Sequence, residues 1–231
     1  LGLGKSDFTT RCAALEAAAT AIRAQSAAIL DANVKDVARA SANGISHAFI
    51  DRLTLDEARI ESMATGLEAM IKLSDPVGVE LARWQQPSGL DIARISTPLG
   101  VIGIIYESRP NVTIDAAGLC IIAGNAAILR GGSDSQLTAS LLAAIMSDGL
   151  ESVDLPRDSV QMVPTTDRQA VGAMLGAVGG IDVVIPRGGR SLVERVQTEA
   201  RVPVFAHLEG ICHIYIHKDA DPQKARKITL N

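Results

Sequence analysis

The sequence predicts an α/β protein in which a helical N-terminal region is followed by a doubly wound, mostly parallel sheet. From Leu99 onward, short runs of consecutive apolar residues alternate with segments of helical pattern. Strands that are apolar throughout are typical of a parallel sheet that helices cover on both faces. The chain has 231 residues, of which 47% are hydrophobic. That is enough for a sizeable core, and it excludes general disorder.

The first ninety residues are predicted to be helical, with apolar faces that serve packing. Leu15, Ile22 and Ile29 recur every seven residues, and Ala-Asn-Gly at 42–44 ends this region. Thr54 and Glu57 have the spacing of a capping box, which predicts the start of another helix. The sequence Asp-Pro at 75–76 ends that helix. The remaining predicted apolar positions are Leu30, Val34 and Val37 in the first region and Ile60, Met63, Leu67, Met70 and Ile71 in the second.

The rest of the chain is assigned to strands and helices in alternation. A turn at 87–89 and an extended piece at 90–97 come first. We expect strands at 101–106, 126–129, 160–163, 182–185, 202–206 and 212–216. We expect helices at 112–123, 136–148, 167–176 and 191–200, and a last helix capped by Asp219.

Composition excludes several classes of protein. A net charge of −4 and 3% aromatic residues argue against nucleic-acid binding. No apolar run approaches the roughly 18 residues of a membrane span, and the N-terminus lacks a signal-peptide pattern. Cys12, Cys120 and Cys212 are widely spaced without a CxxC pair, so we expect no disulfide framework and no metal site. These features favour a cytoplasmic protein. The chain begins without Met, so we expect it to be trimmed or a fragment.

Three predicted strand ends carry unusual residues, at 106–112, 130–135 and 186–191. Ligands of open parallel sheets bind beyond the carboxyl ends of the strands. Two of these loops contain a Gly-Gly pair beside an arginine and precede a helix, whose exposed N–H groups favour an anion. The alternative is an ordinary turn with solvated arginines. The patterns G-x-G-x-x-G and Walker A are absent. The residues alone therefore indicate an α/β protein that binds a phosphate-bearing small molecule.

Several longer motifs carry a resemblance to a known family. They lie at 51–54, 97–103, 106–112, 123–125, 130–133, 163–168, 185–190 and 206–213. With them the chain resembles the γ-glutamyl phosphate reductases, also called glutamate-5-semialdehyde dehydrogenases, of the aldehyde dehydrogenase superfamily. The resemblance implies an NADPH-dependent enzyme of proline biosynthesis, which reduces γ-glutamyl 5-phosphate to glutamate 5-semialdehyde plus phosphate. Another aldehyde dehydrogenase, or a non-catalytic nucleotide-binding or assembly module, is the alternative.

The same resemblance implies a domain division. Residues 1–83 are expected to be the helical part of the cofactor-binding domain, 84–97 an arm through which a homo-oligomer forms, and 98–231 the Rossmann-like cofactor-binding domain. The family's nucleophilic cysteine lies in a Gly-Ile-Cys-Gly segment after a region matched here by 219–221. The chain ends at Asn231, so we expect the catalytic domain to be absent and the fragment to be inactive. Cys212 is expected to be a buried strand cysteine.

Four residues are candidates for substrate chemistry. Asn111 is a possible oxyanion donor, and its alternative role is to cap the following helix. Glu209 matches the general base of hydrolytic aldehyde dehydrogenases, but the reductive cycle needs no such water, so a structural or cofactor-contacting role stays open. Arg109 suits the substrate's phosphate or carboxylate, and Glu107 suits its ammonium group. The alternative for this pair is a mutual surface ion pair.

The cofactor is expected to be NADP. Arg130 and Ser133 take the places of a lysine and a glutamate of NAD-preferring relatives, so the carboxylate that repels a 2′-phosphate is replaced by a hydroxyl. Asp134 could restore some repulsion, and the alternative is a Gly-rich turn in which Ser133 caps the next helix. His207 and His213 flank Glu209, but no metal is expected. The predicted cofactor-binding residues are Arg130, Gly131, Gly132, Ser133, Pro186, Arg187, Gly188 and Gly189.

Overall fold

The computed structural model describes residues 2–207 and 212–230. At its centre is a four-stranded parallel sheet in the order β5-β4-β3-β6. The strands are β3 (Val101–Tyr106), β4 (Ala126–Arg130), β5 (Val160–Met162) and β6 (Val183–Arg187), which confirms four of the predicted strands. The chain builds outward from β3 to β5 and then returns to add β6 on the other side of β3. The order therefore reverses between β3 and β6, and this is where such sheets form a ligand crevice.

Helices cover both faces of the sheet, as the uniformly apolar strands predict. Successive side chains of a strand point to opposite faces, and β3 shows this clearly. Ile104 belongs to a core with α1, α4, α5 and α6, whereas Ile105 belongs to a second core with α7 and α8. The helices are α1 (Phe8–Ala24), α4 (Glu57–Ile71), α5 (Pro110–Ile122), α6 (Gln136–Glu151), α7 (Gln169–Leu175) and α8 (Arg190–Glu199). The short 3₁₀ turns are η1 (Leu3–Lys5), η2 (Ser133–Ser135) and η3 (Arg157–Ser159).

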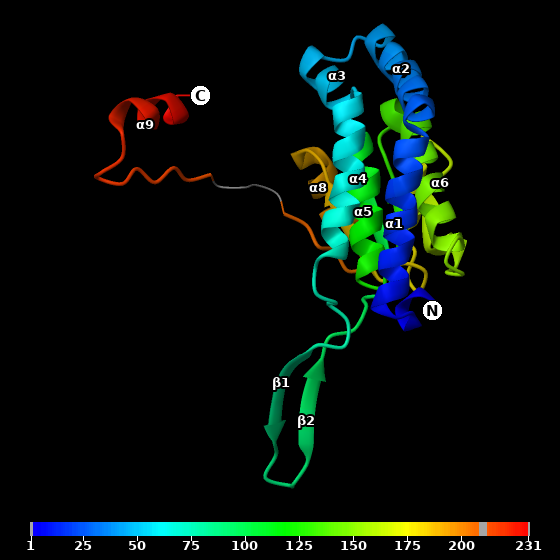
Figure 1. The fold of residues 1–231 in the computed structure, drawn as a ribbon, viewed down its shortest axis with the longest axis vertical. Coiled ribbons are helices and arrows are strands. Elements are labelled where there is room, and N and C mark those ends of the chain that lie inside the picture. Colours follow the sequence, from blue (N-terminus) through cyan, green and yellow to red (C-terminus); the bar gives the residue numbers. More distant parts are fainter. Residues whose placement is uncertain (1, 208–211, 231) are drawn as a thin grey trace.

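The helices of the N-terminal region pack onto the first of these cores (Figure 1). Its predicted apolar face is confirmed at Leu15, Ile22 and Ile29, which are buried. α2 (Ser26–Ala42) ends at the predicted place, and Gly44 there has a φ of +72°, which favours glycine. The prediction for Val34 is wrong, because this side chain is 65% exposed. The polar side chains of Asn33 and Asp36 are buried on that helix instead.

The predicted capping box at the start of α4 is also wrong. Asp56 is the N-cap, and its carboxylate accepts a hydrogen bond from the backbone N–H of Arg59 at 2.7 Å. Thr54 instead ends the preceding helix α3 (His47–Leu53), where its hydroxyl donates to the carbonyl of Ile50. A carboxylate directly before the helix can satisfy the first amides without Thr54.

The predicted extended piece lies in a two-stranded antiparallel hairpin that projects from the helical body (Figure 1). It consists of β1 (Glu80–Gln85) and β2 (Asp91–Ile95), joined by the predicted turn. β1 begins at Glu80, before residue 84, which is the first residue of the arm expected from the sequence. Each residue of β1 is exposed, so the strand carries no alternation between buried and exposed positions that sequence reasoning could use.

Of the two last predicted strands, the structure contains the beginning of one and not the other. Around 202–206, Val204 bridges to Val184 of β6 in parallel, so this segment begins a further strand. The predicted strand at 212–216 is wrong: this segment pairs with no strand of the described chain, and Cys212 is exposed. The buried environment expected for Cys212 is therefore wrong too. The last helix, α9 (Pro222–Thr229), is capped by the side chain of Asp221 rather than by Asp219.

None of the helices in residues 2–207 and 212–230 has the length and apolar character needed to cross a bilayer. Within the same residues, no group of His, Cys, Asp and Glu is arranged to hold a metal ion.

Candidate substrate and cofactor site

A cavity of about 390 Å³ lies at the switch point of the sheet, between the loops that follow β3 and β6. The two loops are held together by backbone contacts. Tyr106 lies beside Arg187 in the parallel register, and the N–H of Glu107 donates to the Arg187 carbonyl at 3.2 Å. The cavity is lined by Arg52, Tyr106, Glu107, Arg109, Val112, Pro186, Arg187, Gly188, Gly189 and His207. The structure thus brings together the sequence-predicted residues of two separate loops.

Glu107 is engaged within this crevice. Its carboxylate accepts a hydrogen bond of 2.6 Å from the N–H of Gly189, at the N-terminus of α8. Gly188 allows this approach, since a Cβ there would lie 2.9 Å from Glu107 Cγ. The ion pairs of the described residues do not include one between Glu107 and Arg109. A carboxylate of the protein itself therefore takes the helix terminus that the sequence suggested for an external anion.

The N-terminus of α6 is occupied in the same way. The fully buried carboxylate of Asp36, from α2, accepts 2.8 Å hydrogen bonds from both the N–H and the hydroxyl of Thr138. Arg39 pairs with the same carboxylate at 2.5 Å and also donates to the Ser133 carbonyl. The cap therefore comes from a distant helix, so the predicted alternative in which Ser133 caps the helix is wrong.

Arg130 lies in a second cavity, of about 360 Å³, whose lining includes Ser133, Thr166, Arg168 and Arg195. Its guanidinium donates to the carbonyls of Gly131 and Thr166 at 2.8 and 2.9 Å. Its buried Nε has no hydrogen-bond partner among the described atoms. Burial lowers the pKa of Arg130, and the charges of Arg168 and Arg195 lower it further. The described lining has three arginines and one carboxylate, that of Glu107, so the cavity is net positive and suits an anion.

Arg168 and Arg195 were not among the sequence-predicted site residues. Arg168 is part of the motif at 163–168, so the sequence did contain a signal for it. Arg195 lies in the predicted helix at 191–200, where no motif marks it as a site residue. Arg195 pairs with Glu199 on its own helix at 3.0 Å. Only the fold brings these side chains next to Arg130.

The two glycines of the loop after β4 allow it to lie close against the loop after β3. A Cβ on Gly132 would lie 2.8 Å from the backbone nitrogen of Ser108, and one on Gly131 would lie 3.2 Å from the Tyr106 ring. Tyr106 itself is buried, and its hydroxyl is hydrogen-bonded to that of Thr113 at 2.7 Å. These glycines therefore bring the β3 and β4 loops together at the carboxyl edge of the sheet.

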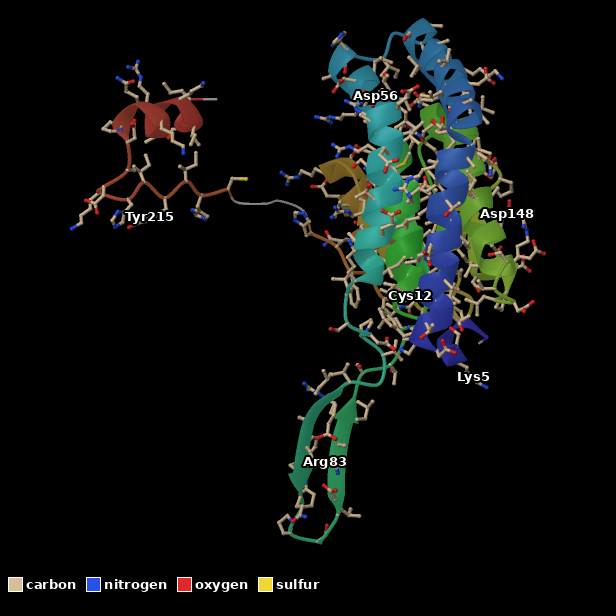
Figure 2. All side chains as sticks on the ribbon, viewed as in Figure 1. Lys5, Cys12, Asp56, Arg83, Asp148 and Tyr215 are labelled. Atoms are coloured by element: carbon tan, nitrogen blue, oxygen red, sulfur yellow. The ribbon has the colours of Figure 1, made fainter. Side chains whose placement is uncertain are left out.

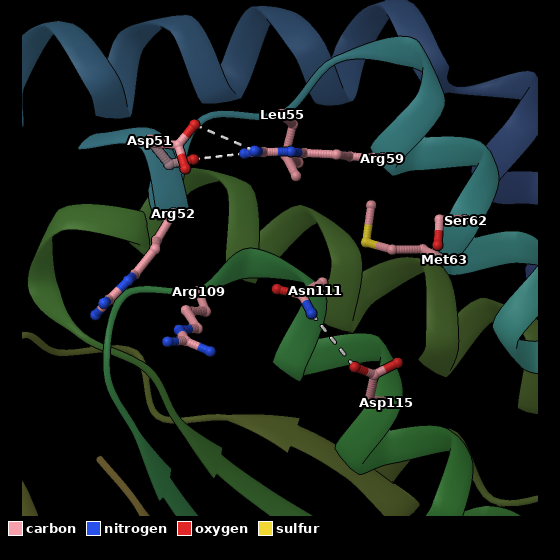
Figure 3. Close-up of a pocket in the computed structure, with 9 residues that line it drawn as sticks. All are labelled: Asp51, Arg52, Leu55, Arg59, Ser62, Met63, Arg109, Asn111 and Asp115. Atoms are coloured by element: carbon pink, nitrogen blue, oxygen red, sulfur yellow. Dashed lines mark hydrogen bonds and ion pairs between the residues drawn. The ribbon is translucent and has the colours of Figure 1, made fainter. Parts of the chain in front are cut away.

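A third cavity, of about 350 Å³, lies beside the switch point between α4 and α5 (Figure 3). Asn111 is in the first turn of α5, and its amide donates to Asp115 at 3.4 Å. The N-cap of that helix is Arg109, which has no side-chain capping bond. The alternative role of Asn111 as a helix cap is therefore wrong. Asp51, Arg52, Leu55, Arg59, Ser62, Met63, Arg109, Asn111 and Asp115 line the cavity.

The remaining residues singled out in the sequence are the cysteines, Glu209 and two histidines. Burial raises the pKa of the Cys120 thiol to about 12, which makes it a poor nucleophile. Glu209 lies outside the described residues. His207 lines the switch-point cavity, whereas His213 is exposed beyond it.

Comparison with known proteins agrees with this architecture. The aldehyde dehydrogenase family matches residues 2–231. A γ-glutamyl phosphate reductase of Brucella suis is 59% identical over 94% of this chain and 52% of its own length. That of Methylorubrum extorquens strain PA1 is 58% identical over 96% of this chain and 52% of its own length. The chain therefore spans about half the length of these curated relatives.

Solved structures give the same result. The γ-glutamyl phosphate reductase of Thermotoga maritima superposes with a TM-score of 0.90 at 37% identity, over 99% of this chain and 55% of that one. The enzyme of the same name from Saccharomyces cerevisiae has a TM-score of 0.82 at 34% identity, over 99% and 58% of the two chains. An acetylating aldehyde dehydrogenase from Geobacillus thermoglucosidasius shares the fold at 15% identity, with a TM-score of 0.65 over 88% and 42% of the two chains. By its match over residues 2–231, this chain belongs to the aldehyde dehydrogenase family.

Proposed function

We propose that this chain is the cofactor-binding part of an NADPH-dependent γ-glutamyl phosphate reductase, which forms glutamate 5-semialdehyde and phosphate in proline biosynthesis. The observation that carries the proposal is the set of arginines around the switch point, which belongs to three adjoining cavities. Both the acyl phosphate and the cofactor are anionic, and arginine binds phosphate and carboxylate in a planar fork. The names of the relatives at 57–59% identity support the same reaction.

The cavity around Arg130 fits a phosphate group. The buried Nε of Arg130 has no described partner, and the exposed side chain of Arg168 lies at the same cavity. Asp134, which could repel a 2′-phosphate, is within 3.4 Å of the Ser108 hydroxyl, which donates to it. We assign the loop from Arg130 through Gly131 and Gly132 to Ser133 to the adenosine ribose and 2′-phosphate.

Pro186, Arg187, Gly188 and Gly189 are assigned to cofactor binding beside the crevice, through the exposed guanidinium of Arg187 rather than through the Gly189 N–H, which Glu107 already holds. Once bound, the nicotinamide cofactor supplies hydride chemistry. The protein's part is to hold the cofactor at the switch point, where the loops after β3 and β6 meet.

Substrate contacts are assigned to the first turn of α5. Arg109 lines both the switch-point cavity and the neighbouring one, so it is placed to bind a phosphate or carboxylate. Asn111 offers its amide N–H to an oxyanion that forms at the reacting carbon. Glu107 is bound to Gly189, so its role is to hold the α8 terminus against the β3 loop. The nucleophilic cysteine is assigned to a part of the whole enzyme outside this chain.

Two further assignments complete the proposal. The exposed hairpin β1–β2 has unpaired strand edges and apolar side chains, which favours pairing with another subunit in a homo-oligomer. The three cysteines are free thiols, and free thiols suit the reducing cytoplasm.

Calorimetric titration of the chain with NADP⁺ and NAD⁺ tests the cofactor assignment. We expect NADP⁺ to bind more tightly, and Arg130→Ala to weaken NADP⁺ binding about 10- to 100-fold while changing NAD⁺ binding little. Arg168→Gln reports on the same phosphate without touching the carbonyls that Arg130 holds. Arg201→Gln, at an exposed arginine outside the cavities, is the control. Equal affinities for the two dinucleotides would refute the assignment.

A further inference from the structure

We propose that the cavity between α4 and α5 binds the amino-acid end of the substrate, with Asp115 accepting hydrogen bonds from its α-ammonium group and Arg52 donating to its α-carboxylate. This inference rests on the proposed function, because it identifies how the same active site would recognise an amino acid. Arg52 lies in the motif at 51–54, but the sequence pattern assigned neither Arg52 nor Asp115 a role at the site, and the two are 63 positions apart.

In the part of the chain that the structure describes, Asp115 is a carboxylate without a cationic partner. It lies one helical turn after Asn111, so both side chains reach the same cavity (Figure 3). Among the described residues, its carboxylate accepts one hydrogen bond, the 3.4 Å contact from that amide, which is near the outer limit for such a bond. Of the α4 residues that line the same cavity, Ser62 and Met63 bring no charge, and Arg59 pairs with Asp51. Burial raises the pKa of Asp115, which means that its ionised form lacks the stabilisation that a cationic ligand would provide.

Arg52 is a cation without an anionic partner among the described residues. It lies in the last turn of α3, beside Asp51, but Asp51 is bound by Arg59. Arg59 also donates to the Thr54 carbonyl at 2.5 Å, so it is held against the backbone of this segment. No ion pair in the described part of the chain contains Arg52. Arg52 and Arg109 each line both this cavity and the switch-point crevice, so two cations lie at the junction between them.

The arrangement matches a small zwitterion whose side chain ends in an anion. In Figure 3, Asn111 lies between Arg52 and Asp115, and Arg109 lies on the side of Arg52. Leu55 and Met63 give the cavity an apolar wall for methylene groups. Its volume of about 350 Å³ can hold a molecule of amino-acid size. An acyl phosphate without an amino group would leave Asp115 without a cationic partner, so this carboxylate would select for the amino acid.

The test uses the full-length enzyme that contains this chain, assayed in the oxidative direction with NADP⁺ and phosphate. Two aldehydes are compared: glutamate 5-semialdehyde, and 5-oxopentanoate, which has the same carbon chain and carboxylate but no amino group. We expect Asp115→Asn to lower kcat/KM for glutamate 5-semialdehyde about 10- to 100-fold, mainly through KM. For 5-oxopentanoate the same variant should change kcat/KM less than about twofold. Asp158→Asn, at an exposed aspartate of η3, is the matched control.

Arg52→Gln should lower kcat/KM for both aldehydes, because both carry the carboxylate, and Arg201→Gln should leave both unchanged. A variant-free measurement covers the case in which Asp115→Asn fails to fold: L-glutamate should inhibit the unaltered enzyme at least about 10-fold more tightly than glutarate. Equal losses on the two aldehydes in Asp115→Asn, or equal inhibition by L-glutamate and glutarate, would overturn the inference. If the unaltered enzyme does not turn over glutamate 5-semialdehyde at all, the proposed function fails instead.

Discussion

The body formed by residues 3–205 without the hairpin buries most of its large apolar side chains, whereas the two segments that project from it leave most of theirs exposed. Inside the body, buried charged groups have partners: Arg11 is 2% exposed, pairs with Asp75 at 2.9 Å and donates to the Ile122 carbonyl. In the hairpin and in the segment 212–230, large apolar side chains face solvent, including Trp84 at 43% and Tyr215 at 84% exposure. Figure 2 shows Tyr215 and Arg83 on these two projections, away from the helical body.

This difference indicates which surfaces of the described chain favour association. In the body, the fully buried charges of Arg11 and Asp36 are paired and the sheet has a core on each face, so this part can be stable by itself. An exposed hairpin edge and apolar side chains along one short segment lose free energy in water and favour association. The predictions that follow test this difference, beginning with the largest effect.

Thiol labelling at pH 8 should separate the two regions most sharply. Burial raises the pKa of Cys120 in the body from 9.0 to about 12, so its thiolate fraction is about a thousandfold lower than that of an ordinary thiol. Cys212, on the projecting segment, is exposed and should react first. In denaturant, the cysteines should react at similar rates. Labelling of native Cys120 as fast as Cys212 would contradict the burial on which this prediction depends.

The same thiol gives the pH dependence of stability a sign. The folded chain holds the Cys120 proton more tightly than the unfolded chain, so the contribution of this group is fully present below pH 9. It is lost progressively as the pH rises from about 9 to about 12.

The buried charge of Asp36 should have the next largest effect. Asp36→Ala leaves the Thr138 N–H and hydroxyl without their acceptor and Arg39 without its partner, which we expect to cost about 3 kcal/mol of unfolding free energy. Asp31→Ala removes an exposed ion pair with Lys35 from the same helix and should cost less than about 0.5 kcal/mol. Urea unfolding monitored by circular dichroism measures both. Similar losses in the two variants would mean that Asp36 does not stabilise the body as described.

The smallest effect on stability is expected in the hairpin. Trp84 lies opposite Ile92 and contacts solvent, so Trp84→Ser should change the unfolding free energy of the body by less than about 0.5 kcal/mol. It should weaken self-association about 10-fold in sedimentation velocity experiments, if the hairpin pairs with a second copy. Val178→Ser, at a 70% exposed position of the body, should alter neither quantity. Unchanged association in Trp84→Ser would remove the support for an oligomerisation arm.

The sequence by itself determined the elements whose signal is local. The strands of the parallel sheet and the end of α2 were predicted closely, because apolar runs and the Asn-Gly step after Ala42 act over a few residues. The loops after β3, β4 and β6 could be recognised as candidate sites for the same reason, since strand ends and glycines are visible in the chain. The motifs shared with relatives add the family, but they leave the geometry of the site open.

Only the tertiary structure decided which polar groups are satisfied and which face a cavity. Asp36 is buried because Thr138, 102 positions away, supplies its hydrogen bonds, and no local pattern contains that information. The apolar run at 212–216 has the composition of a strand, but a strand needs a neighbour to bond its backbone, and the described chain provides none. Arg52 and Asp115 line one cavity because the fold brings side chains of α3, α4 and α5 to it. Contacts between distant residues depend on that packing, which is a property of the whole fold.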